Sequence, residues 1–223
     1  MNTIKSPESE APNLELIEAH LDPFFGEAKT VYHEFLSDLV HVDVLVFPPA
    51  RSRPYWVYVT SGMGDIRMTL DPGLEPNELS RAELMLALPD KWGKRLSKQG
   101  AIGVDDDPEN LGWPIDLLKL LARYPHAAGT WLGHGHTIPL NDEDSGGLGN
   151  DFCCAMITYS TLLPPESTAF VLPDGDELNF YGVTLLHQRE MEFKLRHGFG
   201  ELAEKLDDLG VSEVVDLERP SAV

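Results

Sequence analysis

The alternation of apolar and polar positions is clearest between His41 and Met63, where two runs of β-branched and aromatic residues flank a loop of proline and arginine. This pattern is typical of a β-hairpin. Neighbouring residues such as Val44 and Leu45 face opposite sides of a strand, and both sides are largely apolar here. The hairpin is therefore predicted at the centre of a layered sheet, covered on both faces. Asp43 is the one charge in this strand, and we expect it to be buried and paired.

The rest of the chain predicts further strands and helices in mixed order. Short apolar runs predict strands over residues 30–36, 82–88, 130–138, 151–160, 168–172 and 178–186, of which the last two should form a second hairpin. Repeats of three to four residues predict helices over residues 13–22, 113–124 and 188–209. The apolar stripe of the last helical pair is formed by Met191, Leu195, Phe199, Leu202, Leu206 and Leu209. Residues 72–80, 105–110 and 141–151 are predicted as loops. The fold class is thus α+β, with a central mixed, mostly antiparallel sheet flanked by helices.

The length and hydrophobicity of the chain are those of one large domain. Its 223 residues, 42% of them hydrophobic, can bury a substantial core. Residues 1–12 have no periodicity and contain two prolines, so we expect a disordered arm before a single domain over residues 13–223. There is no apolar run of the roughly 20 residues that a membrane helix needs and no signal-peptide pattern. The protein is therefore expected in the cytoplasm, without a membrane partner.

The formal net charge of −20 is large for this length. It argues against nucleic acid or an anionic membrane as a direct partner, because both would be repelled. A basic protein partner would be attracted. Charge alone leaves a second interpretation open, in which the acidity only keeps the protein soluble.

The two cysteines, Cys153 and Cys154, are adjacent in sequence. In a strand their side chains point to opposite faces, so a disulfide between them is geometrically unfavourable. We expect both to be reduced residues of the core.

Several catalytic and nucleotide-binding motifs are missing. The stretch from Thr60 to Asp65 has two glycines around a methionine, which favours a tight turn or a close backbone approach. It is not the G-x-S-x-G motif of serine hydrolases. The chain also has neither a phosphate-binding P-loop nor a dinucleotide-binding glycine motif.

Two clusters of ionisable residues are candidates for chemistry. The first is formed by His33, Glu34, Asp38, His41 and Asp43. It lacks the H-E-x-x-H spacing, and strand alternation would send His33 and Glu34 to opposite faces. We therefore favour a structural role, with Asp43 or Glu34 hydrogen-bonded to backbone or to an arginine, over a metal site.

The second cluster combines three histidines with an acidic loop: His126, His134, His136, Asp142, Glu143 and Asp144. His134 and His136 would share one face of a strand and could bind zinc or iron. The cupin pattern requires a glutamate four or five residues after the second histidine, where this chain has Leu140 and Asn141. We favour ordinary histidines, no metal and no cofactor, while a metal-dependent hydrolase or oxygenase using His134 and His136 remains the enzymatic alternative.

Several stretches between residues 32 and 190 together resemble the suppressor of fused (SUFU) domain family, especially its bacterial members. They are YHEF (32–35), HVDVLVFPP (41–49) with RPYWVYVTSGM (53–63), RAELMLALP (81–89) with Trp92, WPIDLLKLLARY (113–124), GHTIP (135–139) and NFYGVTLLHQRE (179–190). The resemblance implies a mixed α/β domain without catalytic activity that acts by binding proteins. Animal members accept a short peptide of a transcription factor as an added β-strand, whereas bacterial members resemble immunity proteins that neutralise polymorphic toxins. A cytosolic scaffold without a toxin partner is a further alternative.

The resemblance also indicates candidate binding residues. A tyrosine that ends an A-R-Y triplet lines the peptide site of the animal proteins, and it corresponds to Tyr124. An acid in a G-D-H triplet of that site corresponds to Gly135, before His136, so the acid is missing here. Tyr124 could equally be a core anchor. We expect the partner, a basic toxin domain, to contact this surface and two nearby acidic loops. The loop residues are Asp105, Asp106, Asp107, Asp142, Glu143 and Asp144.

Overall fold

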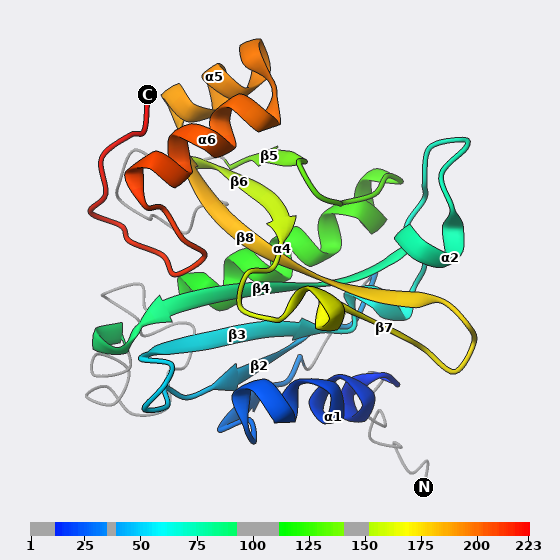
Figure 1. Ribbon diagram of the computed structural model, residues 1–223. Helices are drawn as coiled ribbons and strands as arrows, with labels where there is room; N and C mark the ends of the chain where they lie inside the picture. Colours follow the sequence, from blue (N-terminus) through cyan, green and yellow to red (C-terminus); the bar gives the residue numbers. More distant parts are fainter. Residues whose placement is uncertain (1–11, 35–38, 93–111, 141–151) are drawn as a thin grey trace, which may run out of the picture.

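The computed structural model describes residues 12–34, 39–92, 112–140 and 152–223, which form one mixed sheet with helices on both sides (Figure 1). The strands are β1 Thr30–Tyr32, β2 Asp43–Phe47, β3 Tyr55–Ser61, β4 Arg81–Pro89, β5 Thr137–Pro139, β6 Phe152–Tyr159, β7 Ala169–Val171 and β8 Glu177–His187. Their order across the described sheet is β1-β2-β3-β4-β8-β6-β5, with β7 also paired to β8. The arm predicted over residues 1–12 falls, apart from Pro12, outside the described residues.

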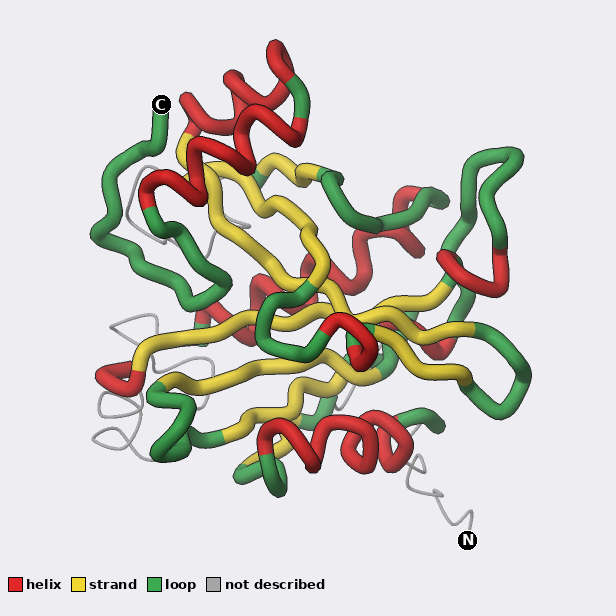
Figure 2. The backbone as a smooth tube through the Cα atoms, viewed as in Figure 1, coloured by secondary structure: helices red, strands yellow, loops and turns green. Residues whose placement is uncertain are grey.

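The helices are distributed before, between and after these strands. They are α1 Leu14–Phe25, α2 Pro76–Leu79, α4 Trp113–Ala128, α5 Gln188–His197 and α6 Phe199–Leu209, and single 3₁₀ turns span η1 Met63–Asp65 and η3 Pro165–Ser167. Figure 2 shows the strands as one twisted layer between these helices. None of the described helices is long and apolar enough to cross a bilayer.

The hairpin predicted between His41 and Met63 is confirmed as the antiparallel pair β2–β3. Every residue of β2 is buried, so the strand is covered on both faces as predicted. Its predicted central position is wrong, because only β1 separates β2 from the edge of the described sheet. An apolar pattern reveals that both faces are covered, but it does not reveal how many strands lie on each side.

The middle of the sheet is β4, which was predicted as a strand over residues 82–88. It pairs antiparallel with β3 and parallel with β8. The other pairs of named strands are antiparallel, so the predicted mixed, mostly antiparallel sheet is confirmed. The predicted second hairpin is confirmed as β7–β8.

Two large apolar clusters cover the two faces of the sheet. Alternate residues of β2 and β3 separate as expected, with Val44 and Tyr58 in one cluster and Leu45 and Val59 in the other. Helix α4 packs on the first face and α1 on the second. The sheet is therefore the middle layer of a three-layer domain.

Helices α5 and α6 form the helical pair predicted near the end of the chain, and Gly198 separates them. They cover the ends of β6 and β8 in a third cluster, which contains Leu186 and Leu206. On β8, Leu186 and Phe180 have the same side-chain direction, so α5 and α6 lie on the same face as α1. The predicted stripe is only partly correct, because Leu195 is 71% exposed.

Two predicted helix ends were too early. Helix α1 continues through Pro23 to Phe25, and α4 continues through Pro125 to Ala128. A proline removes one helical hydrogen bond but does not have to stop a helix that packs on a sheet. Gly129, directly after the last residue of α4, has the left-handed conformation that commonly ends helices.

Other corrections concern segments with weaker patterns. The strand predicted over residues 130–138 is reduced to β5, because the chain turns before it, where His136 N–H donates to the Gly133 carbonyl. The strand predicted over residues 30–36 is reduced to β1, and residues 35–36 lie outside the described part. The loop predicted over residues 72–80 contains the short helix α2. Cys154 is buried and Cys153 half-buried, and both are free thiols.

The predicted close backbone approach occurs at Gly62, at the end of β3. Its φ is +122°, and a Cβ there would lie 2.0 Å from the carbonyl oxygen of His41, so only glycine fits. The turn that follows is held by Glu83, a fully buried residue of β4. Its carboxylate accepts hydrogen bonds from Gly62 N–H, Gly64 N–H and the Thr60 hydroxyl, at 2.9, 3.0 and 2.5 Å. Burial nevertheless raises the pKa of Glu83 to about 7.

Glu83 should therefore make stability depend on pH. Because its pKa is higher in the folded state, the folded protein holds a proton between about pH 4.5 and pH 7 that the unfolded chain releases, and stability falls as pH rises through this window. Glu83→Gln mimics the protonated form. The decrease in unfolding free energy between pH 4.5 and pH 8 should therefore be smaller in the variant by roughly 2 to 3 kcal/mol. Urea unfolding of both proteins at pH 4.5 and pH 8 measures the difference. An identical pH dependence in the variant would contradict the assignment.

Candidate functional site

The segment that connects α4 to β5 carries two of the residues predicted to bind a partner, Gly135 and His136. It is fixed to strand β6 by two hydrogen bonds, from Gly135 N–H to the Ile157 carbonyl and from Ile157 N–H to the His136 carbonyl, at 2.8 and 2.9 Å. Gly135 has a φ of +85°, which favours glycine, and a Cβ added there would lie 3.7 Å from Cγ of Phe199. This segment is therefore a rigid turn on the sheet.

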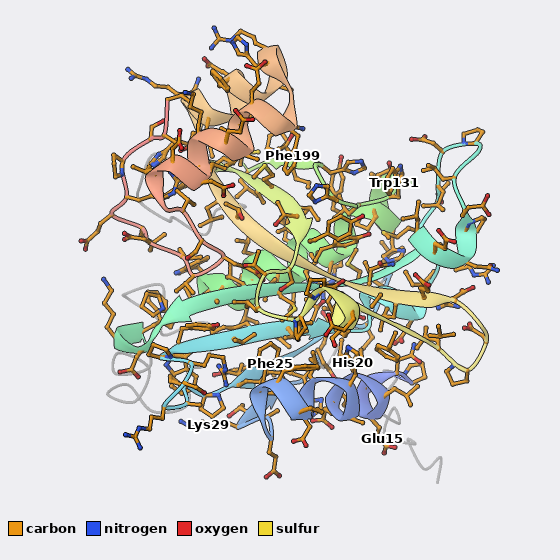
Figure 3. All side chains as sticks on the ribbon, in the orientation of Figure 1. Glu15, His20, Phe25, Lys29, Trp131 and Phe199 are labelled. Carbon is orange, nitrogen blue, oxygen red and sulfur yellow. The ribbon has the colours of Figure 1, made fainter. Side chains whose placement is uncertain are left out.

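Around this turn the structure gathers five rings, which we call the aromatic patch: Trp131, His134, His136, Tyr159 and Phe199. The His134 ring stacks on Tyr159 at 4.4 Å between centroids and meets Phe199 edge-on at 4.6 Å. The His136 ring contacts Trp131 at 4.3 Å. Figure 3 shows Phe199 at the start of α6 and Trp131 beyond the end of α4. Tyr159 is 53% exposed, so the patch presents a large ring to solvent.

His134 is neutral in this arrangement. Its Nδ1 accepts a hydrogen bond from Tyr159 N–H at 3.1 Å, so this nitrogen carries no proton. Burial lowers the pKa of His134 below its ordinary value, which also favours the uncharged ring at neutral pH. The ring therefore adds an apolar, stacked surface to the patch.

A pocket of about 380 Å³ opens beside the patch, between α6 and the sheet. It is lined by His134, Met156, Thr158, Tyr159, Thr161, Thr184, Phe199, Ala203, Leu206, Asp207, Val211, Ser212 and Glu213. Three rings of the patch therefore form part of its wall. A cavity bordered by aromatic side chains is a common form of binding site in proteins.

Glu213 is the charged group at the floor of this pocket, and it is only 5% exposed. Its carboxylate accepts hydrogen bonds from the Ser160 hydroxyl and from the N–H of Thr161, at 3.0 and 2.7 Å. It lies directly over Gly182 of β8, where a Cβ would come within 2.6 Å of the carboxylate carbon. Burial raises the pKa of Glu213 to about 7. Among the described residues no basic side chain forms an ion pair with it.

Among the described residues, none of the ring contacts of the aromatic patch involves Tyr124. Tyr124 lies on the outer side of α4 and is 41% exposed, so it is a surface residue and not a core anchor. The predicted acidic loop residues Asp105, Asp106 and Asp107 lie outside the described residues, as do Asp142, Glu143 and Asp144. Their role in binding stays a prediction.

Asp43 forms a separate polar centre in β2. Its side chain is fully buried, as its place in an apolar strand predicts. It accepts hydrogen bonds from His33 Nδ1, His41 Nε2 and Glu34 N–H, each at 2.9 Å. The expectation that His33 points away from Glu34 by strand alternation does not apply, because both follow the end of β1.

Glu34 extends this centre to α4. Its carboxylate pairs with Arg123 and accepts a hydrogen bond from Val42 N–H at 2.9 Å. Asp38, the remaining acid of this cluster, lies outside the described residues. The polar centre thus connects the segment after β1 with β2 and α4. Its role is structural.

Replacing Asp43 should destabilise the fold. Asp43→Ala leaves the Glu34 N–H and two histidine donors without their acceptor, and the expected loss is roughly 2 to 4 kcal/mol of unfolding free energy. Denaturant unfolding measures it. An unchanged midpoint would show that these bonds contribute nothing.

The geometry of the histidines does not favour a metal site. His126 donates from Nε2 to the Met63 carbonyl at 3.0 Å, and His134 and His136 pack on different rings of the patch. Within the described parts of the chain, no three side chains of histidine, cysteine, aspartate or glutamate are grouped so that they could hold a metal ion.

Elemental analysis of the purified protein should accordingly find no stoichiometric transition metal. The reason is the lack of a ligand set among the described residues, since a stable zinc site requires three or four ligands. One zinc or iron per chain, lost in His134→Ala with His136→Ala, would contradict this and favour the enzymatic alternative.

Sequence reasoning missed Trp131, Tyr159, Phe199 and Glu213 as site residues. Phe199 was recognised only as part of an apolar helix stripe and the other two aromatic residues were not singled out, because only the fold brings these rings together. Glu213 lies in an irregular segment after α6. Its neighbours Ser212 and Asp216 are also polar, so the local sequence carries no signal.

Comparisons with known proteins agree with this fold. The suppressor of fused protein family matches residues 38–220, which is most of the chain. The chain belongs to the suppressor of fused family. Members of this family are in general non-catalytic binding proteins, and no curated protein sequence matches the chain.

Three solved structures are similar in fold. The chain of the Sufu–Fu complex is 18% identical with a TM-score of 0.67, over 95% of this chain and 93% of that one. A SUFU homolog from Neisseria gonorrhoeae FA 1090 is 17% identical with a TM-score of 0.63, over 94% and 96%. Drosophila Suppressor of Fused is 18% identical with a TM-score of 0.66, over 95% of this chain and 51% of that one. At these identities the likeness is one of fold.

Proposed function

We propose that this chain is a non-enzymatic protein-binding domain that acts as a bacterial immunity protein, neutralising a toxin domain by direct binding. The observation that carries the proposal is the aromatic patch, in which Tyr159 is exposed on a rigid turn and strand end. Membership of the suppressor of fused family and the similarity to a Neisseria homolog support it. A solved complex of another member with Fu supports protein binding as the mode of action.

The patch has the physical properties of an interface centre. Tyrosine, tryptophan and arginine dominate the residues that carry most of the binding energy in protein complexes. The rings here are held by stacking and by hydrogen bonds to the sheet, so little conformational entropy is lost when a partner covers them. The patch therefore suits a tight, preorganised contact.

The charge of the chain is compatible with a basic partner. A net charge of −20 attracts a basic protein and repels nucleic acid. Electrostatic attraction of this kind would speed the encounter with a basic toxin domain. Such neutralisation would take place in the cytoplasm of the producing cell.

The experiment uses the product of the neighbouring gene, which the proposal expects to carry a toxin domain. Tyr159→Ala should weaken its binding at least about tenfold, because an exposed ring at the centre of an interface contributes through burial. Leu195→Ala and Val171→Ala are matched controls, since both remove exposed apolar side chains outside the patch and should change affinity less than about twofold. Calorimetry measures affinity, and growth of cells that express the toxin measures protection.

Binding without protection would favour a scaffold with no immunity role. Equal losses in Tyr159→Ala and both controls would contradict the patch as the interface.

The acidic loops should act on the rate of encounter. Neutralising Asp105, Asp106, Asp107, Asp142, Glu143 and Asp144 should lower the association rate by about one to two orders of magnitude at low salt, with little change in dissociation. Tyr124→Ala should instead speed dissociation, if this exposed ring is covered by the partner. Surface plasmon resonance at two salt concentrations measures both. An association rate that does not depend on salt or on the loop variants would refute steering.

A further inference from the structure

The pocket beside the aromatic patch lies between α6 and the sheet, where β8 passes from the α1 layer to the α5–α6 layer. On this face of β8, Phe180 contacts the α1 layer and Leu186 contacts the α5–α6 layer. The two residues between them that share this face are Gly182 and Thr184. Thr158 of β6 lies opposite Gly182 in the register. The core is therefore interrupted here by small and polar side chains, which form the floor of the pocket.

Negative charge converges on this pocket from three sources. Glu213 lies buried at the floor, and Asp207 lines the wall. The third source is the C-terminal end of α6, which carries the negative pole of the helix dipole. Basic residues in the last turn of a helix stabilise this pole, but α6 has none there and carries Asp207 and Asp208 instead. This arrangement costs stability in the free protein and creates a site that favours a cation.

The pocket also has groups that suit a flat cation. The rings of His134, Tyr159 and Phe199 form its aromatic wall. The hydroxyls of Thr158 and Thr184 make no hydrogen bond with the described residues, so they are available to a ligand. Arginine differs from lysine in that its guanidinium stacks on rings, donates five hydrogen bonds in one plane and is more weakly hydrated.

We propose that this pocket binds an arginine side chain of the protein partner, with the guanidinium stacked against the aromatic wall and directed at Glu213. The inference rests on the proposed protein-binding function and specifies the residue that the partner contributes. A volume of about 380 Å³ accommodates such a side chain. In the free protein, burial raises the pKa of Glu213 to about 7, and a guanidinium beside the carboxylate would favour its charged form.

The test titrates N-acetyl-arginine amide, as the probe, into the isotope-labelled full chain and detects binding by NMR. It should cause saturable shifts at Tyr159, Phe199 and Glu213. N-acetyl-citrulline amide, which has the same shape without the charge, should cause none, and N-acetyl-lysine amide should bind at least about threefold more weakly. Shifts of equal size with citrulline, or no saturation with arginine, would overturn the proposal. Equal binding of lysine would overturn the assignment to guanidinium.

Two exposed acids of the same helix turn provide a matched pair of variants. Asp207→Asn should weaken binding of the arginine probe at least about threefold, because Asp207 lines the pocket. Asp208→Asn removes the same charge one residue away and should have a smaller effect. Equal effects of the two variants would mean that only the overall charge of the helix matters. This result would contradict the pocket as the binding site of the probe.

Ala203→Leu fills the pocket without removing a charge and should abolish probe binding. Its thermal unfolding, compared with wild type, verifies that the variant folds. The proposed function can fail separately. If the probe binds but the toxin domain does not, the immunity role fails and the pocket stands. If the toxin binds wild type and Ala203→Leu equally well, the pocket fails and the immunity role stands.

Discussion

The structure depends on one pairing, the parallel contact of β4 with β8 in the middle of the sheet. It joins the strands of the first part of the chain, β1 to β4, to β5 to β8 of the second part. Residues on both faces of β4 are buried, so this pairing is covered by both apolar clusters. Without it the two sets of antiparallel strands would be separate sheets with exposed edges.

The candidate site is a consequence of how β8 continues beyond that pairing. At Tyr181 and Gly182 the strand pairs with β4 on one side and β6 on the other, and it then continues along β6 and changes from the α1 layer to the α5–α6 layer. Gly182 marks the change, because its missing side chain leaves the space that Glu213 occupies. The same region holds the end of β6, where Tyr159 becomes exposed. The gap between two helical layers thus produces both the pocket and the patch.

Local patterns predicted the two hairpins, the strand β4 and the helix α4, because alternation and helical periodicity are properties of neighbouring residues. The position of β2 near the sheet edge was not predictable in this way, since strand order depends on the distant pairing of β4 with β8. The same limit applies to the site. Asp43 was recognised because a charge in an apolar strand is conspicuous, whereas Tyr159, Phe199 and Glu213 are unremarkable alone and acquire meaning only from their contacts.

The central claim is that a protein partner covers the aromatic patch and the neighbouring pocket. Hydrogen–deuterium exchange of the chain, alone and with the protein partner that the proposal expects from the neighbouring gene, tests this most directly, because it maps the contact without altering any residue. The account predicts slower exchange in the complex over residues 131–139, 156–161 and 199–213. Protection confined to α1 and β1, with unchanged exchange in those three segments, would contradict it.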